Sequence, residues 1–211
     1  MHKKISYKWA LIVLTVIHLV GLIGMLSPLK EYILPLSGLN LLVSFFLLLQ
    51  FETINQKLSK WLFYTVFLTI IIEAIGVGTG KIFGVYEYGS SLGPKIFDVP
   101  LIIGVNWAML ALASYGVLKK FELNKWIHIA GAASIMMLLD MLIEPMVSKL
   151  DFWTWQNNEI PAQNFFAWFG VAFAFIFFLH RISNNQESNK LALPLLLTQA
   201  MFFITLNLFF K

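Results

Sequence analysis

Three carboxylates inside apolar stretches of the chain are the residues best suited to chemistry. Glu73, Asp140 and Glu144 each lie in a segment that otherwise has the composition of a membrane span. Because a central charge costs roughly 2.5–3.5 kcal/mol on insertion scales, such acids indicate a functional site. Asp140 and Glu144 are four residues apart and therefore share a helix face. Since two close acids repel when both are ionised, we expect at least one to keep its proton at neutral pH, as a general acid must.

Measured along the spans, these three acids lie at a depth similar to that of two asparagines. At 1.5 Å per residue from the inner end, Glu73 lies about 18 Å along its span, Asp140 about 21 Å and Glu144 about 27 Å. Asn106 and Asn164 enter their own spans from the outer end. The sequence thus predicts five polar groups from four spans in one outer layer.

A purely structural role is the alternative for each acid. Glu144 precedes Pro145, which disfavours helical geometry at Glu144 and places it at the end of the span. There it could be a solvated interfacial residue. Glu73 and Asp140 could pair with a lysine of the outer loops or with an asparagine, although two deep acids are harder to explain in this way.

Aromatic side chains surround the same layer. They could line a substrate cavity, or they could serve core packing and an interfacial belt. The residues are Trp107 and Trp168 within spans, and Tyr86, Tyr88, Trp153 and Trp155 in outer loops.

Motifs for cofactors, metals and phosphates are missing from the sequence. The chain has no cysteine, which excludes disulfides, thiolate nucleophiles and Cys-based metal sites. The histidines lack metal-ligand spacing, and there is no dinucleotide-binding fingerprint. The glycine run at residues 76–80 lacks the order of a phosphate-binding loop and is interpreted as a flexible helix exit. We therefore expect no cofactor and no metal.

The composition predicts that transmembrane helices hold these residues in place. Of the 211 residues, 59% are hydrophobic and only 12% charged, so lipid must solvate most of the surface. The predicted fold is all-α: a single transmembrane domain over residues 1–211 with about seven transmembrane helices. The predicted spans are Trp9–Leu26, Ile33–Phe51, Trp61–Val77, Pro100–Leu118, Trp126–Glu144, Asn164–Arg181 and Leu191–Phe210.

Charge sets the expected orientation in the bilayer. The net charge of +4 comes from Lys and Arg between apolar blocks, which argues for a membrane protein and against a nucleic-acid binder. With the N-terminus inside, ten Lys and Arg fall on inner segments and five on outer ones, which favours an inside N-terminus and an outside C-terminus in a bacterial inner membrane. The first span lacks a good cleavage site and is expected to be retained. The oligomeric state stays open.

The middle of the chain has the pattern of a duplication. An acid, a lysine, two aromatics, an acid–hydrophobe–proline triplet and an Asn with a Trp occur in this order in residues 73–107 and again in 140–168. Two spans per unit give the copies one orientation, a parallel repeat. Chance similarity between two aromatic hairpins is the alternative.

The same stretches resemble a known family. The runs EAIGVGTGKIFGVYEY at 73–88, VP at 99–100, NW at 106–107, LDMLIEP at 139–145, WTW at 153–155 and IPAQNFFAW at 160–168 are similar to the carotenoid biosynthesis membrane proteins, which include CruF-type carotenoid 1,2-hydratases and bisanhydrobacterioruberin hydratases. They cover nearly half of the chain. The flanking spans match in hydropathy only.

The resemblance implies a cofactor-independent carotenoid hydratase that acts on a membrane-dissolved carotenoid. Such an enzyme adds water to the terminal double bond of an acyclic end group. Asp140 or Glu73 would then protonate the double bond, while a neighbouring carboxylate and Asn106 or Asn164 would orient water, and aromatics would shield the cation. A lycopene-type cyclase that uses the same protonation is one alternative. A non-enzymatic transporter or proton pathway is another.

Overall fold

Seven helices long and apolar enough to cross a membrane form the chain, which makes it an integral membrane protein. The computed structural model describes residues 5–183 and 188–210, and the seven spans lie within these ranges. Every predicted span is confirmed. Lys3, Lys4 and Lys211, which contributed to the charge count, lie outside the described residues. The helices are α1 (Tyr7–Met25), α2 (Lys30–Ile33), α3 (Ser37–Leu49), α4 (Gln56–Thr79), α5 (Leu101–Leu118), α6 (Lys125–Ile143), α7 (Ala162–Ile182) and α8 (Ala192–Phe209).

Two elements differ in detail from the predicted spans. The second span is composite, because α2, the 3₁₀ turn η1 (Leu34–Leu36) and α3 follow one another without a break. The third extends to Thr79 and ends at Gly80, whose φ of 66° is the left-handed conformation that favours glycine. The glycine run is therefore mostly helical, and its interpretation as a flexible exit from residue 76 is wrong.

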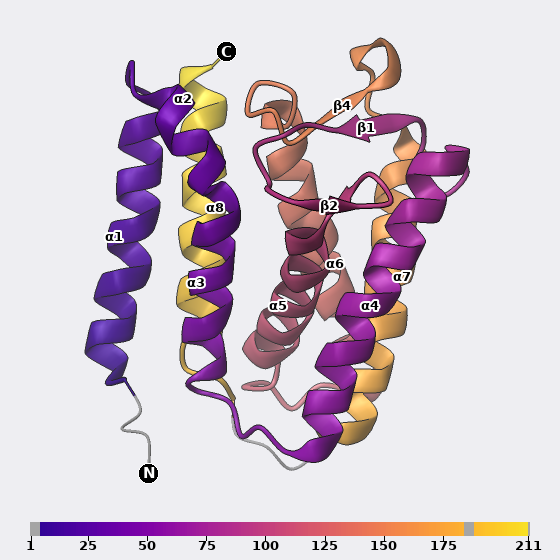
Figure 1. Cartoon of the computed structure of the whole chain (residues 1–211). Helices are drawn as coiled ribbons and strands as arrows, with labels where there is room; N and C mark the ends of the chain where they lie inside the picture. The colour runs from indigo at the N-terminus through magenta and orange to yellow at the C-terminus, as the bar shows by residue number, and fades with distance from the viewer. Residues whose placement is uncertain (1–4, 184–187, 211) are drawn as a thin grey trace.

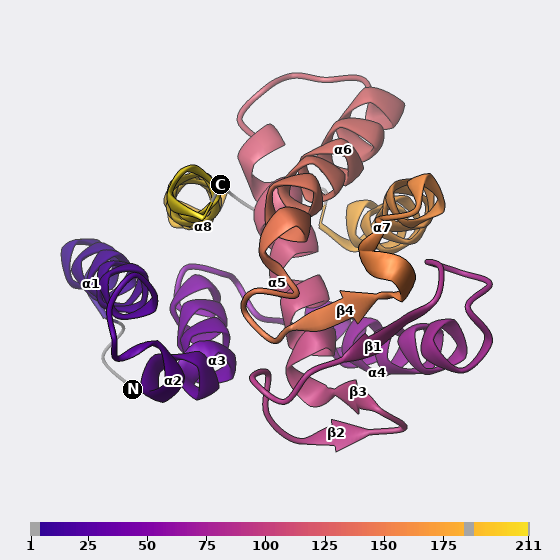
Figure 2. The same cartoon turned by 90° about the horizontal axis from the view of Figure 1, so that it is seen from above.

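Helix α5 is the centre of the bundle. It contacts α3, α4, α6, α7 and α8, and two thirds of its span is buried. Gly104 permits its close approach to α4, since a Cβ there would lie 2.7 Å from the Val66 carbonyl oxygen. Seen from above, α1, α3 and α8 form a group on one side of α5, and α4 and α7 lie on the other (Figure 2). The bundle thus has a four-helix part, α4–α7, and a three-helix part.

The two long loops form a cap over one end of the bundle (Figure 1). Strand β1 (Tyr86–Tyr88) pairs antiparallel with β4 (Trp153–Trp155), and β2 (Lys95–Ile96) pairs with β3 (Val99–Pro100). Two 3₁₀ turns, η2 (Glu144–Met146) and η3 (Gln156–Asn158), flank β4. The expectation that these aromatic loops fold back onto the bundle is confirmed.

The β1–β4 pairing relates the two halves of the predicted repeat. Equivalent positions are 67 apart in the chain: 73 and 140, 86 and 153, 88 and 155. The register pairs Tyr86 with Trp155 and Tyr88 with Trp153. Tyr86 therefore lies opposite the residue equivalent to Tyr88, and Tyr88 lies opposite the residue equivalent to Tyr86. Trp107 of α5 stacks on Trp168 of α7 at 4.1 Å between ring centroids. This is the arrangement expected of two α-hairpins related by a pseudo-two-fold axis.

Candidate active site

Glu73 is held beneath the cap by three donors. Its side chain is 3% exposed near the end of α4. Oε2 accepts hydrogen bonds from the hydroxyls of Tyr86 at 2.5 Å and Tyr88 at 2.9 Å, and Oε1 accepts one from Trp107 Nε1 at 3.2 Å. Burial and the adjacent Glu73 charge raise the pKa of both tyrosines well above the usual value, so both phenols stay protonated and donate. Glu73 is the acceptor in all three hydrogen bonds.

Asp140 and Glu144 are joined through Asn164. The Asn164 amide nitrogen donates to Asp140 Oδ2 and to Glu144 Oε1, both at 2.9 Å. Trp155 Nε1 donates to Glu144 Oε2 at 2.6 Å. Asp140 is fully buried, and its Oδ1 has no hydrogen-bond partner among the described residues. The i,i+4 spacing and the shared amide thus keep two carboxylates beside each other, which favours one proton between them.

A small chamber lies between Glu73 and Glu144. Its volume is about 30 Å³, room for about one or two water molecules. The polar part of its wall comes from Glu73, Glu144, Asn106 and Asn164, and the rest is aromatic or aliphatic: Phe83, Tyr86, Tyr88, Ile103, Trp107, Ile143, Trp153, Trp155 and Trp168. The chamber therefore offers space for water, two separately held carboxylates and aromatic faces.

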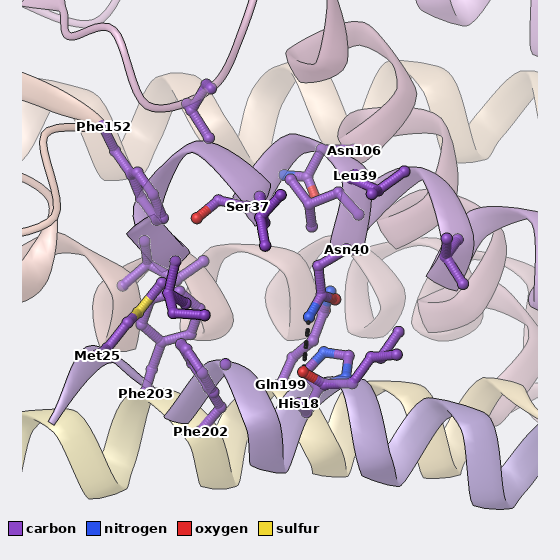
Figure 3. A pocket seen from close by; sticks show the side chains of 18 of the residues that line it. His18, Met25, Ser37, Leu39, Asn40, Asn106, Phe152, Gln199, Phe202 and Phe203 are labelled. Carbon is purple, nitrogen blue, oxygen red and sulfur yellow. Dashed lines mark hydrogen bonds between the residues drawn. The ribbon is translucent and has the colours of Figure 1, made fainter. Parts of the chain in front are cut away.

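A larger apolar cavity adjoins the chamber. It has a volume of about 320 Å³, within the range typical of small-molecule sites, and its wall comes mainly from α1, α3, α5 and α8. Figure 3 shows part of this wall, with Phe152, Phe202 and Phe203 on it. Four residues belong to both walls: Ile103, Asn106, Ile143 and Trp153. The two spaces are therefore adjacent, and Asn106 lies where they meet.

Part of the wall of the apolar cavity is made by side chains that are also exposed on the outside of the bundle. Four of its lining residues on α1, η1 and α3 are about half exposed: Val16 at 49%, Val20 at 55%, Leu36 at 50% and Leu39 at 56%. All are aliphatic, and the α1 pair lies in the middle of the span. A long hydrophobic ligand could therefore leave the cavity sideways between α1 and α3.

The acids and asparagines that were predicted to lie at a similar depth are close together in the structure. Glu73, Glu144, Asn106 and Asn164 line one chamber, and Asp140 reaches it through Asn164. Asp140 itself lies on the wall of neither cavity. All six aromatics singled out from the sequence, Tyr86, Tyr88, Trp107, Trp153, Trp155 and Trp168, line the chamber.

One structural alternative for the acids is contradicted, and another is confirmed in part. Glu144 is 3% exposed, so it is not a solvated interfacial residue. The 3₁₀ turn η2 directs its side chain inward, beneath β4. Lys149 donates to the Phe210 carbonyl instead of pairing with an acid. Asp140 does pair with an asparagine, Asn164, and that asparagine also contacts Glu144.

Sequence reasoning missed the apolar cavity and one feature of the chamber. The cavity is built by flanking helices whose hydropathy carries no family motif. Its signal in the sequence is the placement of Asn40 and Gln199 in otherwise apolar spans. Gly76 was also missed: a Cβ there would lie 2.9 Å from the Phe83 ring and 3.3 Å from the Tyr86 hydroxyl. The absence of a side chain at Gly76 lets Tyr86 reach Glu73.

Comparison with known proteins shows the family of the chain. The family described as carotenoid biosynthesis protein matches residues 33–211, most of the chain. The bisanhydrobacterioruberin hydratase of Haloarcula japonica is 29% identical over 105 residues, which cover 46% of this chain and 36% of that protein. The alignment thus spans about a third of this curated relative. No solved structure is significantly similar to the chain. The match over residues 33–211 makes the chain a member of the carotenoid biosynthesis protein family.

Proposed function

We propose that this protein is a carotenoid hydratase that adds water across the terminal double bond of an acyclic end group. The observation that carries the proposal is the chamber, in which two carboxylates held by different donors face a space of water size next to an apolar cavity. Acid-catalysed hydration needs a proton donor, a base for water and an apolar site for the polyene.

Substrate enters from the bilayer between α1 and α3. The end group fills the apolar cavity, and its terminal double bond lies beside Asn106, where the cavity meets the chamber. The remaining polyene stays in lipid beyond the half-exposed residues of α1 and α3. Because the polyene moves from lipid into an apolar cavity, van der Waals packing against the wall favours this binding, and removal from water does not.

Glu144 is the proton donor in this proposal. Its proton goes to the less substituted carbon of the double bond, where a C–H bond forms as the π bond breaks, and the other carbon becomes a tertiary cation. The aromatic faces of the wall stabilise this cation, each by up to about 2 kcal/mol when desolvated. Asp140 is a positioning residue, because it acts on Glu144 through the amide of Asn164.

Glu73 is the base. A water held by Asn106 attacks the cation, the new C–O bond forms, and a water proton passes to the Glu73 carboxylate. Tyr86, Tyr88 and Trp107 keep that carboxylate aimed at the chamber. A second water returns the proton to Glu144, so one water is consumed and no cofactor is required.

Two alternative functions would use some of the same residues. A cyclase begins with the same protonation and ends by losing a proton, so it needs no water at the cation, and the chamber volume favours hydration. A transporter or proton pathway needs acids along the membrane, whereas Glu73, Asp140 and Glu144 gather at the capped end. We place the protein in a bacterial cytoplasmic membrane with this end outside and the N-terminus inside.

Product mass tests the proposal. The chain is expressed in a bacterium that accumulates lycopene, and the pigments are analysed by mass spectrometry. We expect products heavier by one water per end group. A cyclic product of unchanged mass would support the cyclase, and an unaltered pigment profile with folded protein would contradict both enzymes.

A further inference from the structure

A surface of cations and aromatic rings lies at the end of the bundle opposite the cap. Helix α6 begins there at Lys125 and α7 ends there at Ile182, and the two helices pack side by side (Figure 2). None of the residues of this surface lines the chamber or the apolar cavity. The residues of this α6–α7 surface are Lys125, Trp126, Phe169, Phe173, Phe177 and Arg181.

Two cations from different helices lie over one ring of this surface. Lys125 Nζ is 5.0 Å from the centre of the Phe177 ring, and the guanidinium carbon of Arg181 is 4.7 Å from the same centre. Lys125 Nζ also lies 4.7 Å from the centre of the Trp126 ring. Aromatic faces attract each cation, but the two positive charges repel each other. An anion within reach of both would therefore be attracted by both.

Neither cation has a polar partner within the chain. Across residues 5–183 and 188–210, Lys125 and Arg181 donate no side-chain hydrogen bond, and no carboxylate lies within ion-pair distance of them. Glu122, exposed three residues before Lys125, pairs with neither. A guanidinium group has five N–H donors and an ammonium group has three. These donors therefore remain available to a ligand from outside the chain.

The lysines at the capped end of the bundle differ in this respect. Lys30 and Lys149 also lie over one ring, that of Phe210, at 5.4 and 6.0 Å from its centre. However, Lys30 donates to the Lys149 carbonyl at 2.8 Å, and Lys149 donates to the Phe210 carbonyl. That pair thus binds the carbonyl oxygens around the end of α8, whereas the pair of the α6–α7 surface binds no acceptor of the described chain.

A ladder of aromatic rings leads from the cations toward the middle of the bilayer. Trp126, which is 55% exposed, stacks on Phe173 and Phe177 with ring centroids 6.4 and 6.1 Å away. Phe169 continues the ladder at 6.1 Å from Phe173. From Arg181 to Phe169 the helix rises about 18 Å at 1.5 Å per residue, close to the roughly 15 Å hydrocarbon depth of one leaflet. The surface therefore combines a cationic end with an apolar strip as long as an acyl chain is deep.

We propose that the α6–α7 surface is a binding site for one anionic phospholipid of the leaflet at the uncapped end. The lipid phosphate contacts Lys125 and Arg181, and one acyl chain packs along the ladder. The planar fork of Arg181 matches two phosphate oxygens at once, and Lys125 adds a point charge. A zwitterionic phospholipid binds less well, because the same two side chains repel its headgroup cation. The site is separate from the chamber, so this inference does not depend on the proposed hydration.

Competition between two matched lipids tests the inference. Phosphatidylglycerol and phosphatidylcholine with identical acyl chains are added in equal amounts to the detergent-solubilised protein. Native mass spectrometry then gives the ratio of the two lipid adducts, which measures the preference directly. We expect about ten phosphatidylglycerol adducts for each phosphatidylcholine adduct, since each of the two cations strengthens binding of an anionic lipid several-fold. Millimolar inorganic phosphate should not displace the lipid, because it lacks the acyl chain that packs on the ladder.

Charge-matched variants assign the preference to the α6–α7 surface. Lys125→Gln and, separately, Arg181→Gln should each lower the tenfold ratio to less than about threefold. Lys120→Gln removes the same charge from an exposed position in the loop before α6 and should keep the ratio. An equal fall in Lys120→Gln would show a general attraction of charge and overturn the inference. Equal binding of both lipids by the wild type, or displacement by inorganic phosphate, would also overturn it, even if one variant failed to fold.

Discussion

Tyr86 and Trp155 face each other across the β1–β4 pair, and each donates a hydrogen bond to a different buried carboxylate. Their rings lie 5.0 Å apart. The Tyr86 hydroxyl donates to Glu73, and the Trp155 indole nitrogen donates to Glu144. A three-residue strand pairing therefore fixes the positions of two acids from separate helical hairpins.

Removing one of these donors should impair turnover without unfolding the protein. Tyr86→Phe keeps the ring and its packing but deletes the 2.5 Å hydrogen bond to Glu73. We expect kcat for hydration to fall about 10- to 100-fold, since a fixed donor at a reacting group has effects of this order. Tyr64→Phe, on the exposed face of α4, is the matched control and should be silent. Unchanged kcat in Tyr86→Phe would show that Glu73 does not need this support.

Two glycines on the last turns of α4 make a sharper comparison. A methyl at Gly76 would meet Phe83 and Tyr86, whereas a Cβ at Gly78 meets nothing within 4 Å. Gly76→Ala should displace Tyr86 and lower hydration at least tenfold. Gly78→Ala should retain activity and slightly raise thermal stability, because alanine is the better helix former. If both variants were equally active, the contact between Gly76 and Tyr86 would have no role in the reaction.

The apolar cavity can be filled from α1. An ideal Cβ at Gly21 makes only ordinary contacts, 3.6 Å from Phe202 and 3.8 Å from Asn40, so a larger side chain would project into the space. Gly21→Phe should lower hydration of lycopene by at least tenfold through loss of substrate binding. Gly170→Phe, where a Cβ meets nothing within 4 Å on α7, controls for the added ring. Wild-type KM in Gly21→Phe would mean that substrate does not use this cavity.

Asp151 accepts pH-sensitive hydrogen bonds that hold parts of the cap together. Partial burial alone would raise the pKa of Asp151, but hydrogen bonds from the hydroxyls and amides of Ser90 and Ser91 outweigh it and hold this pKa below the usual value. A folded-state pKa below the unfolded one gives stability that is present above about pH 4 and is lost as the pH falls through the folded value.

Asp151→Asn should therefore lower the melting temperature by a few degrees at pH 7, and the difference from wild type should shrink as the pH falls below about 4. Circular dichroism of the detergent-solubilised protein measures both. Asp98→Asn, in the exposed turn between β2 and β3, serves as the control. A difference that persisted undiminished at pH 3 would contradict the role assigned to the ionised carboxylate.

The spans and the identity of the acids could be predicted from the sequence because both depend on local composition. A carboxylate in an apolar run is conspicuous, and 1.5 Å per residue places it at the right depth. The pairing of Tyr86 with Trp155 could not be predicted, since two three-residue strands far apart in the chain carry no periodic pattern. The distinction between Asp140 and Glu144 also needed coordinates, because i,i+4 spacing alone does not tell which acid faces the chamber.

The apolar cavity was beyond prediction for a different reason. Its wall comes from α1, α3, α5 and α8, and the void depends on how these helices pack against one another. Apolar residues that face a cavity have the same hydropathy as those that face lipid. Only polar exceptions such as Gln199 mark the wall in the sequence.

Hydration by variants of the acids tests whether Glu73 and Glu144 carry out the reaction. Purified wild type, Glu73→Gln, Glu144→Gln and the control Glu87→Gln, whose side chain is exposed on β1 between the two tyrosines, are incubated with lycopene, and the gain of one water is followed by mass spectrometry. We expect wild-type rates for Glu87→Gln and rates at least about 100-fold lower for Glu73→Gln and Glu144→Gln. Wild-type rates in both Glu73→Gln and Glu144→Gln would show that neither carboxylate takes part in the reaction.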